Sequence, residues 1–201
     1  MASSELEFQV KAMIRPAVSL FVVLTVVTGV IYPLAVTGVA KAAFPSQAAG
    51  SLIVKDGKTV GSSLIGQNFT DPKYFWGRPS ATSPMANNGQ GSAGSNLGPL
   101  NPALTDAIKG RVEALHAADP GNKALVPVDL VTTSASGLDP EISVAAAQYQ
   151  VARIARLRGV SPEVIEGIIA RHTQGRLFGL LGEPRVNVLD MNLELQKSSA
   201  S

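Results

Sequence analysis

Few residues in this chain have the chemistry to catalyse a reaction or to bind a metal ion. The sequence contains no cysteine and two histidines, His116 and His172. Without cysteine there is no thiol nucleophile and no thiolate metal site, and two histidines far apart in the sequence do not indicate an imidazole site. Both fall in segments expected to be helical, and no G-x-S-x-G nucleophile motif occurs. We therefore expect no catalytic residue and no metal site in this chain.

One glycine-rich string, residues 89–94, matches the phosphate-binding pattern G-x-G-x-x-G. In nucleotide-binding folds this pattern follows a buried strand and opens a helix. Here no apolar strand precedes Gly89, and Gly98 and Pro99 follow where the helix would have to begin. We interpret the string as a loop.

A row of arginines, Arg153, Arg156 and Arg158, falls mostly on one side of a predicted helix. Such a row is ordinarily a solvated face, and alternatively a docking surface for an acidic partner. Over the whole chain, 17 lysines and arginines face 15 acids, a net charge of +2. This small excess does not indicate nucleic-acid binding.

The longest apolar segment predicts a membrane span. No charged residue lies between Arg15 and Lys41, and about 25 residues of helix slightly exceed the roughly 30 Å hydrocarbon core of a bilayer. The apolar core of a cleaved signal peptide is shorter, about 7–15 residues. We expect a short tail at 1–15 and a transmembrane helix at 16–40, whose flanking lysines and arginines do not decide its orientation.

Four residues of the span are candidate contacts for partner helices. Thr25 and Gly29 lie one helical turn apart as a pair of small residues, which lets another helix approach closely. Tyr32 and Pro33 follow, and the proline is expected to kink the helix. Small residues are also common in membrane helices that have no partner, so this alternative stays open.

The rest of the chain predicts a single soluble α+β domain. Apolar residues on both sides of Asp56 and Gly57 indicate a β-hairpin. Alternating apolar residues predict strands at 126–131 and 186–195, the second with a slip of phase. A capping residue before a proline marks the start of three helices: Asn101 with Pro102, Asp139 with Pro140, and Ser161 with Pro162. Because no βαβ unit repeats, the fold class is α+β.

Residues 66–102 show little periodicity, and we expect them to form a long ordered loop. Loops of this length are uncommon in compact domains without a functional reason. Aromatic residues that could anchor the loop gather near its start: Phe69, Tyr74, Phe75 and Trp76.

Several strings of this sequence resemble one known family. They are Gly66-Gln67-x-Phe69, Tyr74-Phe75-x-Gly77-Arg78-Pro79-Ser80-Ala81, residues 94–99, residues 134–143, and Val186-Asn187-Val188-Leu189-x-x-Asn192-Leu193-x-Leu195. With Arg15-Pro16 at the start of the span, their order and spacing resemble the C subunit of the Kdp potassium-transporting ATPase over about residues 11–196.

The resemblance implies an accessory subunit of a bacterial inner-membrane complex. In that family a channel-like subunit selects K⁺ and a P-type subunit hydrolyses ATP, so the complex handles K⁺ and ATP with Mg²⁺ and this chain binds no cofactor tightly. The amino terminus would be cytoplasmic and the domain, residues 41–196, extracytoplasmic in the periplasm. Residues 197–201 lie outside the resemblance and are expected to form a disordered tail.

Family members are described as catalytic chaperones that raise the ATP affinity of the P-type subunit. The resemblance implies a nucleotide-linked glutamine in an alanine-rich helix, which matches Gln150 first and Gln148 second; a glutamine on the helix surface is the alternative. Because a periplasmic domain does not reach cytoplasmic ATP, we expect the effect to pass through Arg15 and the span.

The unusual loops are expected to form the docking surface. These are the aromatic part of the excursion with Phe75, Trp76, Arg78 and Pro79, and the 134–140 loop with Asp139. The alternatives are a membrane-anchored periplasmic binding module and a signal-anchored enzyme.

Overall fold

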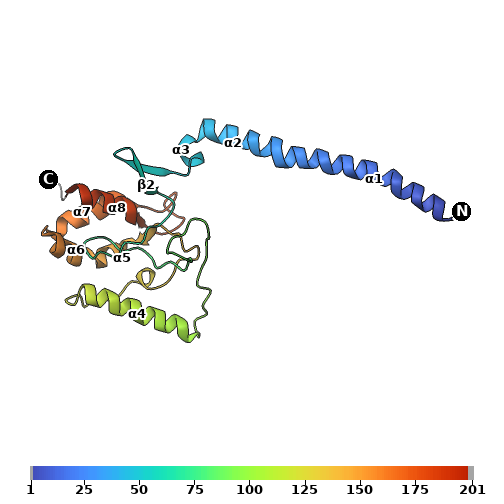
Figure 1. The fold of residues 1–201 in the computed structure, drawn as a ribbon. Coiled ribbons are helices and arrows are strands. Elements are labelled where there is room, and N and C mark those ends of the chain that lie inside the picture. Colours follow the sequence, from blue (N-terminus) through green and yellow to red (C-terminus); the bar gives the residue numbers. More distant parts are fainter. Residues whose placement is uncertain (1, 199–201) are drawn as a thin grey trace. The chain divides into compact units, whose positions relative to one another are not determined.

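A nearly continuous helix begins the chain in the computed structural model, which describes the backbone of residues 2–198 and the side chains of residues 12–197. This helix consists of α1 (Ala2–Val26), a π-helical turn η1 (Val27–Ile31) and α2 (Tyr32–Ala43), and the short α3 (Pro45–Ala48) follows it. Contacts divide the chain into two units, residues 1–51 and 52–201, which are described separately (Figure 1).

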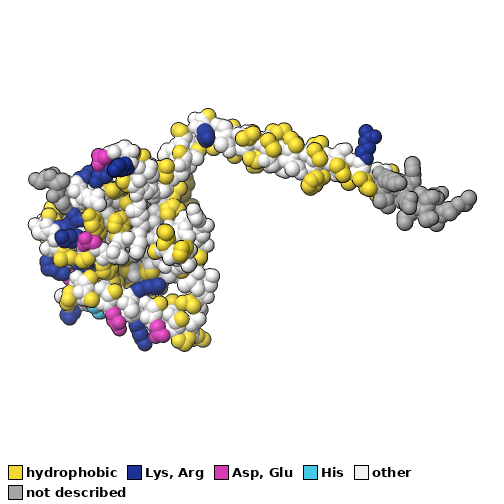
Figure 2. Space-filling model, in the orientation of Figure 1, with side chains coloured by type: hydrophobic (Ala, Val, Ile, Leu, Met, Phe, Trp, Pro, Cys, Tyr) yellow, Lys and Arg dark blue, Asp and Glu magenta, His cyan; other side chains and the backbone are white. Residues whose placement is uncertain are grey.

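The first unit contains one helix that is long and apolar enough to cross a membrane, Ala12–Ala43. Its most apolar window has a mean hydropathy of 2.2, and none of that window is buried. Figure 2 shows hydrophobic side chains along this helix, with basic side chains only toward its ends among the coloured atoms. A side-chain surface of this kind is stable in lipid, so the span expected at 16–40 lies within a helix of sufficient length.

The π-helical turn lies immediately before the proline that was expected to kink the span. Pro33 has no N–H to donate to the carbonyl four residues earlier. The N–H of Tyr32 bonds instead to the carbonyl of Val27, five residues back. The extra residue in this turn therefore accommodates the proline without ending the helix.

The second unit begins with the expected hairpin, β1 (Leu52–Lys55) and β2 (Lys58–Ser62). Asp56 and Gly57 both have positive φ, 51° and 74°. This is the backbone of a type I′ turn, for which Asp-Gly is a preferred pair. The hairpin prediction is confirmed.

A second antiparallel sheet has the strand order β3-β5-β4, with β5 (Arg185–Asn187) between β3 (Glu141–Ser143) and β4 (Thr173–Gln174). Among the described residues, five α-helices accompany the sheets: α4 (Pro102–Ala118), α5 (Val144–Tyr149), α6 (Val151–Arg158), α7 (Pro162–His172) and α8 (Val188–Ser198). The core is formed by residues from the sheet, from α4 to α8 and from the loops, among them Phe75, Leu115, Leu130, Ile142, Ile154, Ile165, Ile168, Val186, Met191 and Leu195. The architecture is α+β, as expected.

The strand expected at 126–131 is wrong. This segment forms a short 3₁₀ turn, η2 (Val128–Leu130), which follows Pro127. The N–H and the hydroxyl of Thr132 both bond to the carbonyl of Val128, at 2.9 and 2.8 Å. Because these polar groups bond to each other locally, the segment closes into a turn. A strand would instead need hydrogen bonds to a neighbouring strand.

The strand expected at 186–195 is also wrong, because only its first residues are extended. The side chain of Asn187 accepts hydrogen bonds from the N–H groups of Leu189 and Asp190, at 3.0 and 3.2 Å. This N-cap starts α8 immediately after β5. The slip in the alternating pattern is therefore the change from the strand period of two to the helical period.

The second helix starts later than expected and is interrupted. Asp139 and Pro140 precede β3 rather than a helix, and Ser143 is the N-cap, accepting from the Ala146 N–H at 3.0 Å. At Gln150 the helix is interrupted between α5 and α6. In contrast, α4 and α7 begin at their prolines as predicted, and the side chain of Asn101 caps α4.

The segment from residue 63 to 101 contains no helix or strand, as expected for the long loop. It is held by the 134–140 loop: the Gly66 N–H bonds to the Leu138 carbonyl at 2.8 Å, and the Ala93 N–H to the Ser136 carbonyl at 2.9 Å. Gly137 has a φ of +68°, and a Cβ there would lie 2.5 Å from the Ala93 carbonyl oxygen. The two loops are therefore packed together.

Residues 197–201, expected to be a disordered tail, are described only in part. Lys197 and Ser198 belong to α8. Residues 199–201 lie outside the described part of the chain.

Candidate docking site

Two side-chain amides hold the peptide backbone of the long loop at Phe75 and Trp76. Asn192 accepts from the Phe75 N–H at 2.8 Å and donates to its carbonyl at 3.0 Å. Gln150 does the same for Trp76, accepting at 2.8 Å and donating at 3.1 Å. Both amide side chains are buried. They replace the partners that a neighbouring strand would supply, so a segment without secondary structure can lie in the core.

Arg153 completes this attachment from the next turn of α6. Its guanidinium donates to the carbonyls of Pro72 and Tyr74 and to Gln150, and it lies over the Trp76 ring, 4.5 Å from the ring centroid. Burial lowers the pKa of Arg153 to about 10, although Asp119 acts in the opposite direction. The guanidinium is thus still charged at neutral pH, and its charge is stabilised by carbonyl dipoles and an aromatic face.

The expectation of a solvated arginine face is wrong for Arg153, which is 2% exposed. Arg158 also contacts the loop, since it donates to the Lys73 carbonyl at 2.7 Å and lies over the Tyr74 ring. Arg156 pairs with Asp119 at 2.7 Å. Arg153 and Arg158 hold the loop against α6 because carbonyls of the loop converge on them, whereas Arg156 is exposed and pairs with the residue that ends α4.

Beyond this attachment, the loop brings Arg78 to Asp139, two residues that were expected to belong to one surface. Arg78 Nη1 lies 3.1 Å from Asp139 Oδ2, and Arg78 Nη2 donates to the Thr133 carbonyl at 3.2 Å. The other oxygen of Asp139 accepts from the Glu141 N–H at 3.0 Å. About a quarter of each side chain of the pair is exposed, 26% and 28%. The pair therefore joins the long loop to the 134–140 loop at the surface.

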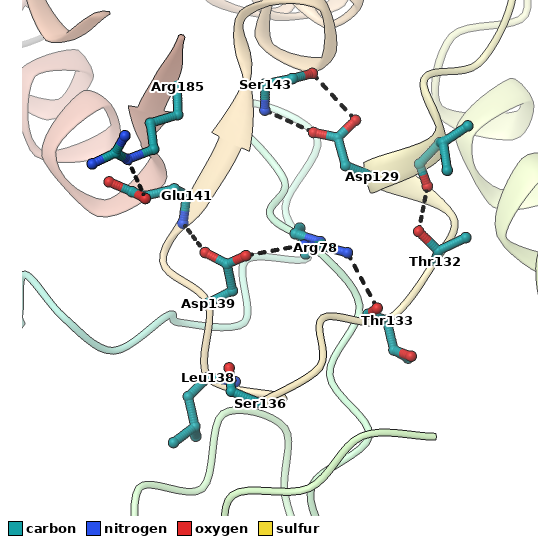
Figure 3. A network of polar contacts seen from close by, with 11 residues as sticks. Arg78, Asp129, Thr132, Thr133, Ser136, Leu138, Asp139, Glu141, Ser143 and Arg185 are labelled. Carbon is teal, nitrogen blue, oxygen red and sulfur yellow. Dashed lines mark hydrogen bonds and ion pairs between the residues drawn. The ribbon is translucent and has the colours of Figure 1, made fainter. Parts of the chain in front are cut away.

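Further polar pairs border the same place (Figure 3). Asp129 accepts from the N–H of Ser143 at 2.7 Å and from its hydroxyl at 3.3 Å. Glu141 pairs with Arg185 at 2.7 Å. These groups line an open cavity of about 560 Å³, together with Arg78, Val128, Thr132, Asp139, Ile142, Gly182, Glu183 and Pro184. We call this cavity the Arg78 cleft.

The Arg78 cleft is acidic on balance. Four carboxylates line it against two arginines. Each carboxylate already has a partner, because Glu183 pairs with Arg176 at 2.7 Å and the others are paired as described above. With Arg176 counted as the partner of Glu183, four carboxylates face three arginines, and this excess of one negative charge favours a cationic partner surface or cations in solution.

A second cavity, of about 300 Å³, lies between the long loop and α4. Trp76, Arg78 and Pro79 line it, so three of the expected contact residues border open space. Phe75 does not, since it is 0% exposed. Its aromatic ring anchors the loop in the core, and we correct its expected role from partner contact to support.

The two candidate glutamines lie in different environments. Gln148 is exposed and lines a cavity of about 450 Å³ with Asp119, Tyr149 and Arg156. Gln150 is 1% exposed, which corrects the alternative that it is a surface glutamine.

Comparison with known sequences decides the family. A family described as "KdpC: K+-transporting ATPase, c chain" matches residues 14–197. The chain belongs to the KdpC family.

KdpC relatives match over nearly their whole length. A "Potassium-transporting ATPase KdpC subunit" of Variovorax paradoxus is 69% identical over 94% of this chain and 97% of the relative. Those of Dechloromonas aromatica and Methylococcus capsulatus are 66% and 63% identical, over 94% and 90% of this chain and 99% and 95% of the relatives. With its apolar amino-terminal helix, this KdpC-family chain is a single-pass membrane protein.

The candidate contact residues of the span lie in the first unit of this KdpC-family chain. Arg15 and Thr25 are on α1, Gly29 is in the π-helical turn, and Tyr32 and Pro33 open α2. All five are exposed. A Cβ added to Gly29 would meet no atom within 4 Å, so the small residue leaves an open place on the helix surface.

Sequence reasoning did not assign a role to Asn192, Asp129 or Ser143: Asn192 holds the loop, and Asp129 with Ser143 forms one wall of the Arg78 cleft. It named Gln150 as a nucleotide-linked residue, whereas in the structure Gln150 holds the loop. The available signal was an amide or a carboxylate inside an apolar run, as at Asn192 and Asp129. A buried residue of this kind, such as Asn192, is hydrogen-bonded and marks a polar contact in the core, and the half-buried Asp129 marks one at the edge of the cleft.

The histidines have the ordinary helical positions that the sequence suggested. His116 is exposed on α4, and His172 at the end of α7 contacts Glu194 at 2.6 Å. Among residues 12–197, no cluster of three or more histidines and carboxylates is arranged to hold a metal ion.

Proposed function

We propose that this chain is an accessory subunit of an ATP-driven potassium-uptake complex and that it has no active site of its own. The observation that carries the proposal is the match to relatives named potassium-transporting ATPase KdpC subunits over more than nine-tenths of the chain. In this function K⁺ and ATP with Mg²⁺ are handled by a channel-like subunit and a P-type catalytic subunit, and this chain helps to assemble and stabilise them.

The proposed topology has the span in the bacterial inner membrane, the amino terminus in the cytoplasm and the α+β domain in the periplasm. The resemblance to the family supports it, and the charges that flank the span are compatible with it. In this arrangement any effect on ATP affinity passes through Arg15 and the helix, because the domain is on the other side of the membrane from ATP.

The proposed docking surface is the Arg78 cleft with the adjoining loop residues Trp76 and Pro79. Three properties support it: the cleft is open, its side chains are held by neighbouring groups, and it is acidic on balance. Such a surface suits a partner that presents basic residues. Placed near a potassium entrance, its negative potential would also raise the local concentration of K⁺.

The proposed contribution of Gln150 to ATP affinity is indirect. Its side chain is buried and holds Trp76 and Arg153, so it fixes the loop that carries Arg78. Substitution of Gln150 would then change partner binding through the loop. Gln148 is exposed at a cavity, and a direct contact of the domain with a nucleotide would be tested there.

The test is affinity purification of the tagged full chain from its native membrane in mild detergent. We expect a large channel-like subunit and a P-type ATPase to co-purify, and K⁺-stimulated ATPase activity to be lost when this chain is omitted. Recovery of the chain alone as a stable, monodisperse protein would contradict the proposal and favour an anchored binding module.

The docking surface is tested in the same experiment with Arg78→Ala and Asp139→Ala. We expect each to lower recovery of the other subunits severalfold. Arg171→Ala is the matched control, since Arg171 also forms a surface ion pair, with Glu194, but lies outside the cleft. Normal assembly and transport with both cleft variants would show that another surface is used.

A further inference from the structure

A short apolar finger extends between β4 and β5, and we define it as residues Leu177–Leu181. Its four large side chains are mostly exposed: Leu177 59%, Phe178 85%, Leu180 80% and Leu181 61%. No charged residue interrupts them, and Gly179 is the fifth residue. Four neighbouring apolar side chains in water are costly and promote aggregation, so a finger of this composition is expected to be covered in the working protein.

The finger has a defined backbone. Leu177 and Leu181 exchange two hydrogen bonds, at 2.8 and 3.0 Å, and the Leu180 N–H bonds to the Leu177 carbonyl at 3.2 Å. Phe178 and Gly179 both have positive φ, 54° and 73°. Phe178 and Gly179 are therefore the central residues of a β-turn with the φ values of type I′, and with Leu180 they form a three-residue loop between the paired Leu177 and Leu181.

Phe178 is poorly suited to this turn on structural grounds alone. The first central position of a type I′ turn favours Asn, Asp or Gly, because a bulky side chain is strained at positive φ. Phe178 accepts this strain and yet packs against little of its own chain. The benefit of an aromatic side chain here must therefore come from something outside the chain.

The base of the finger carries no net charge. Arg176 pairs with Glu183 on the opposite side of the base, with hydrogen bonds of 2.9 and 2.7 Å to its two oxygens. Arg185, which follows, pairs with Glu141. A base with paired charges can approach an apolar or zwitterionic surface without leaving an unpaired charge there.

The chain itself supplies a surface of this kind, because its helix Ala12–Ala43 is anchored in a bilayer. Eight residues, 44–51, connect the end of α2 to the start of β1. Fully extended, they span at most about 29 Å, and a domain of 150 residues has a radius of gyration of only about 15 Å. The bilayer is therefore always within reach of the domain, at a high effective concentration.

We propose that the apolar finger inserts into the interfacial region of the bilayer that holds the chain's own helix. Phe178 and Leu180 are the leading side chains, and the paired charges of Arg176 and Glu183 stay at the level of the lipid headgroups. The insertion gives the domain a second attachment to the membrane and so limits its rotation about the connection at 44–51. This inference depends on the membrane anchor and not on the proposed docking at the Arg78 cleft.

The test uses the full chain in phosphatidylcholine vesicles brominated in the upper part of the acyl chains. Trp76 is the single tryptophan, so wild type gives the baseline. In Phe178→Trp we expect bromine to quench about half of the added emission, since an interfacial segment lies roughly 5–10 Å deep. Lys109→Trp, at an exposed position of α4, is the matched control and is expected to stay unquenched.

Leu180→Trp is a second reporter, at a position without positive φ, and it should be quenched as well. Adding Phe178→Asn to it should weaken this quenching while preserving the fold, because Asn is favoured in the turn. If both reporters are unquenched by bromine and open to iodide in water, the proposal is wrong. It is equally wrong if they become shielded only when the co-purifying subunits are present, which would assign the finger to a protein interface.

Discussion

Asn192 and Gln150 hydrogen-bond both polar groups of two consecutive residues, Phe75 and Trp76, from two different helices. Each amide acts as a substitute for a neighbouring strand. The long loop is therefore held in place at Phe75 and Trp76, just before Arg78, although it contains no helix or strand of its own. The position of the proposed docking surface depends on these amides.

Asn192→Ala is expected to destabilise the domain by about 2–6 kcal/mol, because two buried polar groups of Phe75 lose their partners at about 1–3 kcal/mol each. The measurement is urea unfolding of the full chain in detergent. Gln148→Ala, an exposed amide, is the control and should change the free energy of unfolding by less than about 0.5 kcal/mol. Equal effects of the two variants would mean that the amide contact contributes little.

Arg153→Lys is expected to cost about 2–3 kcal/mol, since an ammonium cannot reach both loop carbonyls and lie flat on Trp76 at once. The same unfolding experiment measures it, and Trp76 fluorescence reports the local change. Arg156→Lys is the matched control: its partner Asp119 tolerates either cation, and a cost below about 1 kcal/mol is expected. If Arg153→Lys left the domain as stable as wild type, the proposed attachment would be contradicted.

Glu194 is expected to make stability depend on pH. Burial raises the pKa of Glu194, whereas hydrogen bonds from Arg171 and His172 lower it. The net effect is a pKa below the ordinary value of 4.5. A depressed folded pKa adds stability that is complete above the unfolded pKa and is lost as pH falls through the folded value. Wild type should thus exceed Glu194→Gln in unfolding midpoint near neutral pH, and the difference should vanish at the lowest pH. A difference that persists there would refute the assignment.

A double-mutant cycle tests the pair of Arg78 and Asp139 inside the chain. Because about a quarter of each side chain is exposed, we expect a coupling free energy of only about 0.5–1 kcal/mol for stability. If each single variant lowers recovery of the other subunits severalfold but changes the free energy of unfolding by only this small amount, the pair contacts a partner. Coupling of several kcal/mol would instead indicate that the pair is structural.

Thr25→Leu combined with Gly29→Leu is expected to lower co-purification of the other subunits severalfold, by blocking close helix approach. The chain itself should keep its helix content, since a Cβ at Gly29 meets no atom within 4 Å. Circular dichroism in detergent measures the helix content. Ser19→Leu, elsewhere on the same helix, is the control. Unchanged assembly in the double variant would exclude this face as a contact.

Local signals predicted the span, the hairpin and the helices α4 and α7. A run without charge, an Asp-Gly turn, and a proline at the first helical position each act within a few residues. The pairing of Arg78 with Asp139 was anticipated only as membership of one surface, from the unusual composition of the two loops.

The errors share a different cause. At Asn187 a cap formed by one side chain turned an apparent strand into α8, and at Thr132 local bonds replaced a strand by a turn. The buried states of Gln150 and Arg153 depend on residues 74 to 81 positions away. Contacts over such separations leave little trace in the local pattern, so their partners were visible only in the structure.

The distance along the chain between Phe75 and Asn192, 117 residues, also sets an order of events during synthesis. At about 5–20 residues per second, a ribosome needs roughly 6–23 seconds to make that stretch. During this time the polar groups of Phe75 have no permanent partner, and the loop remains open to proteases and chaperones. The loop that carries the proposed docking residues is therefore fully held only after α8 is made, and a ribosome that stops before Asn192 releases a chain that has its membrane helix but lacks this attachment.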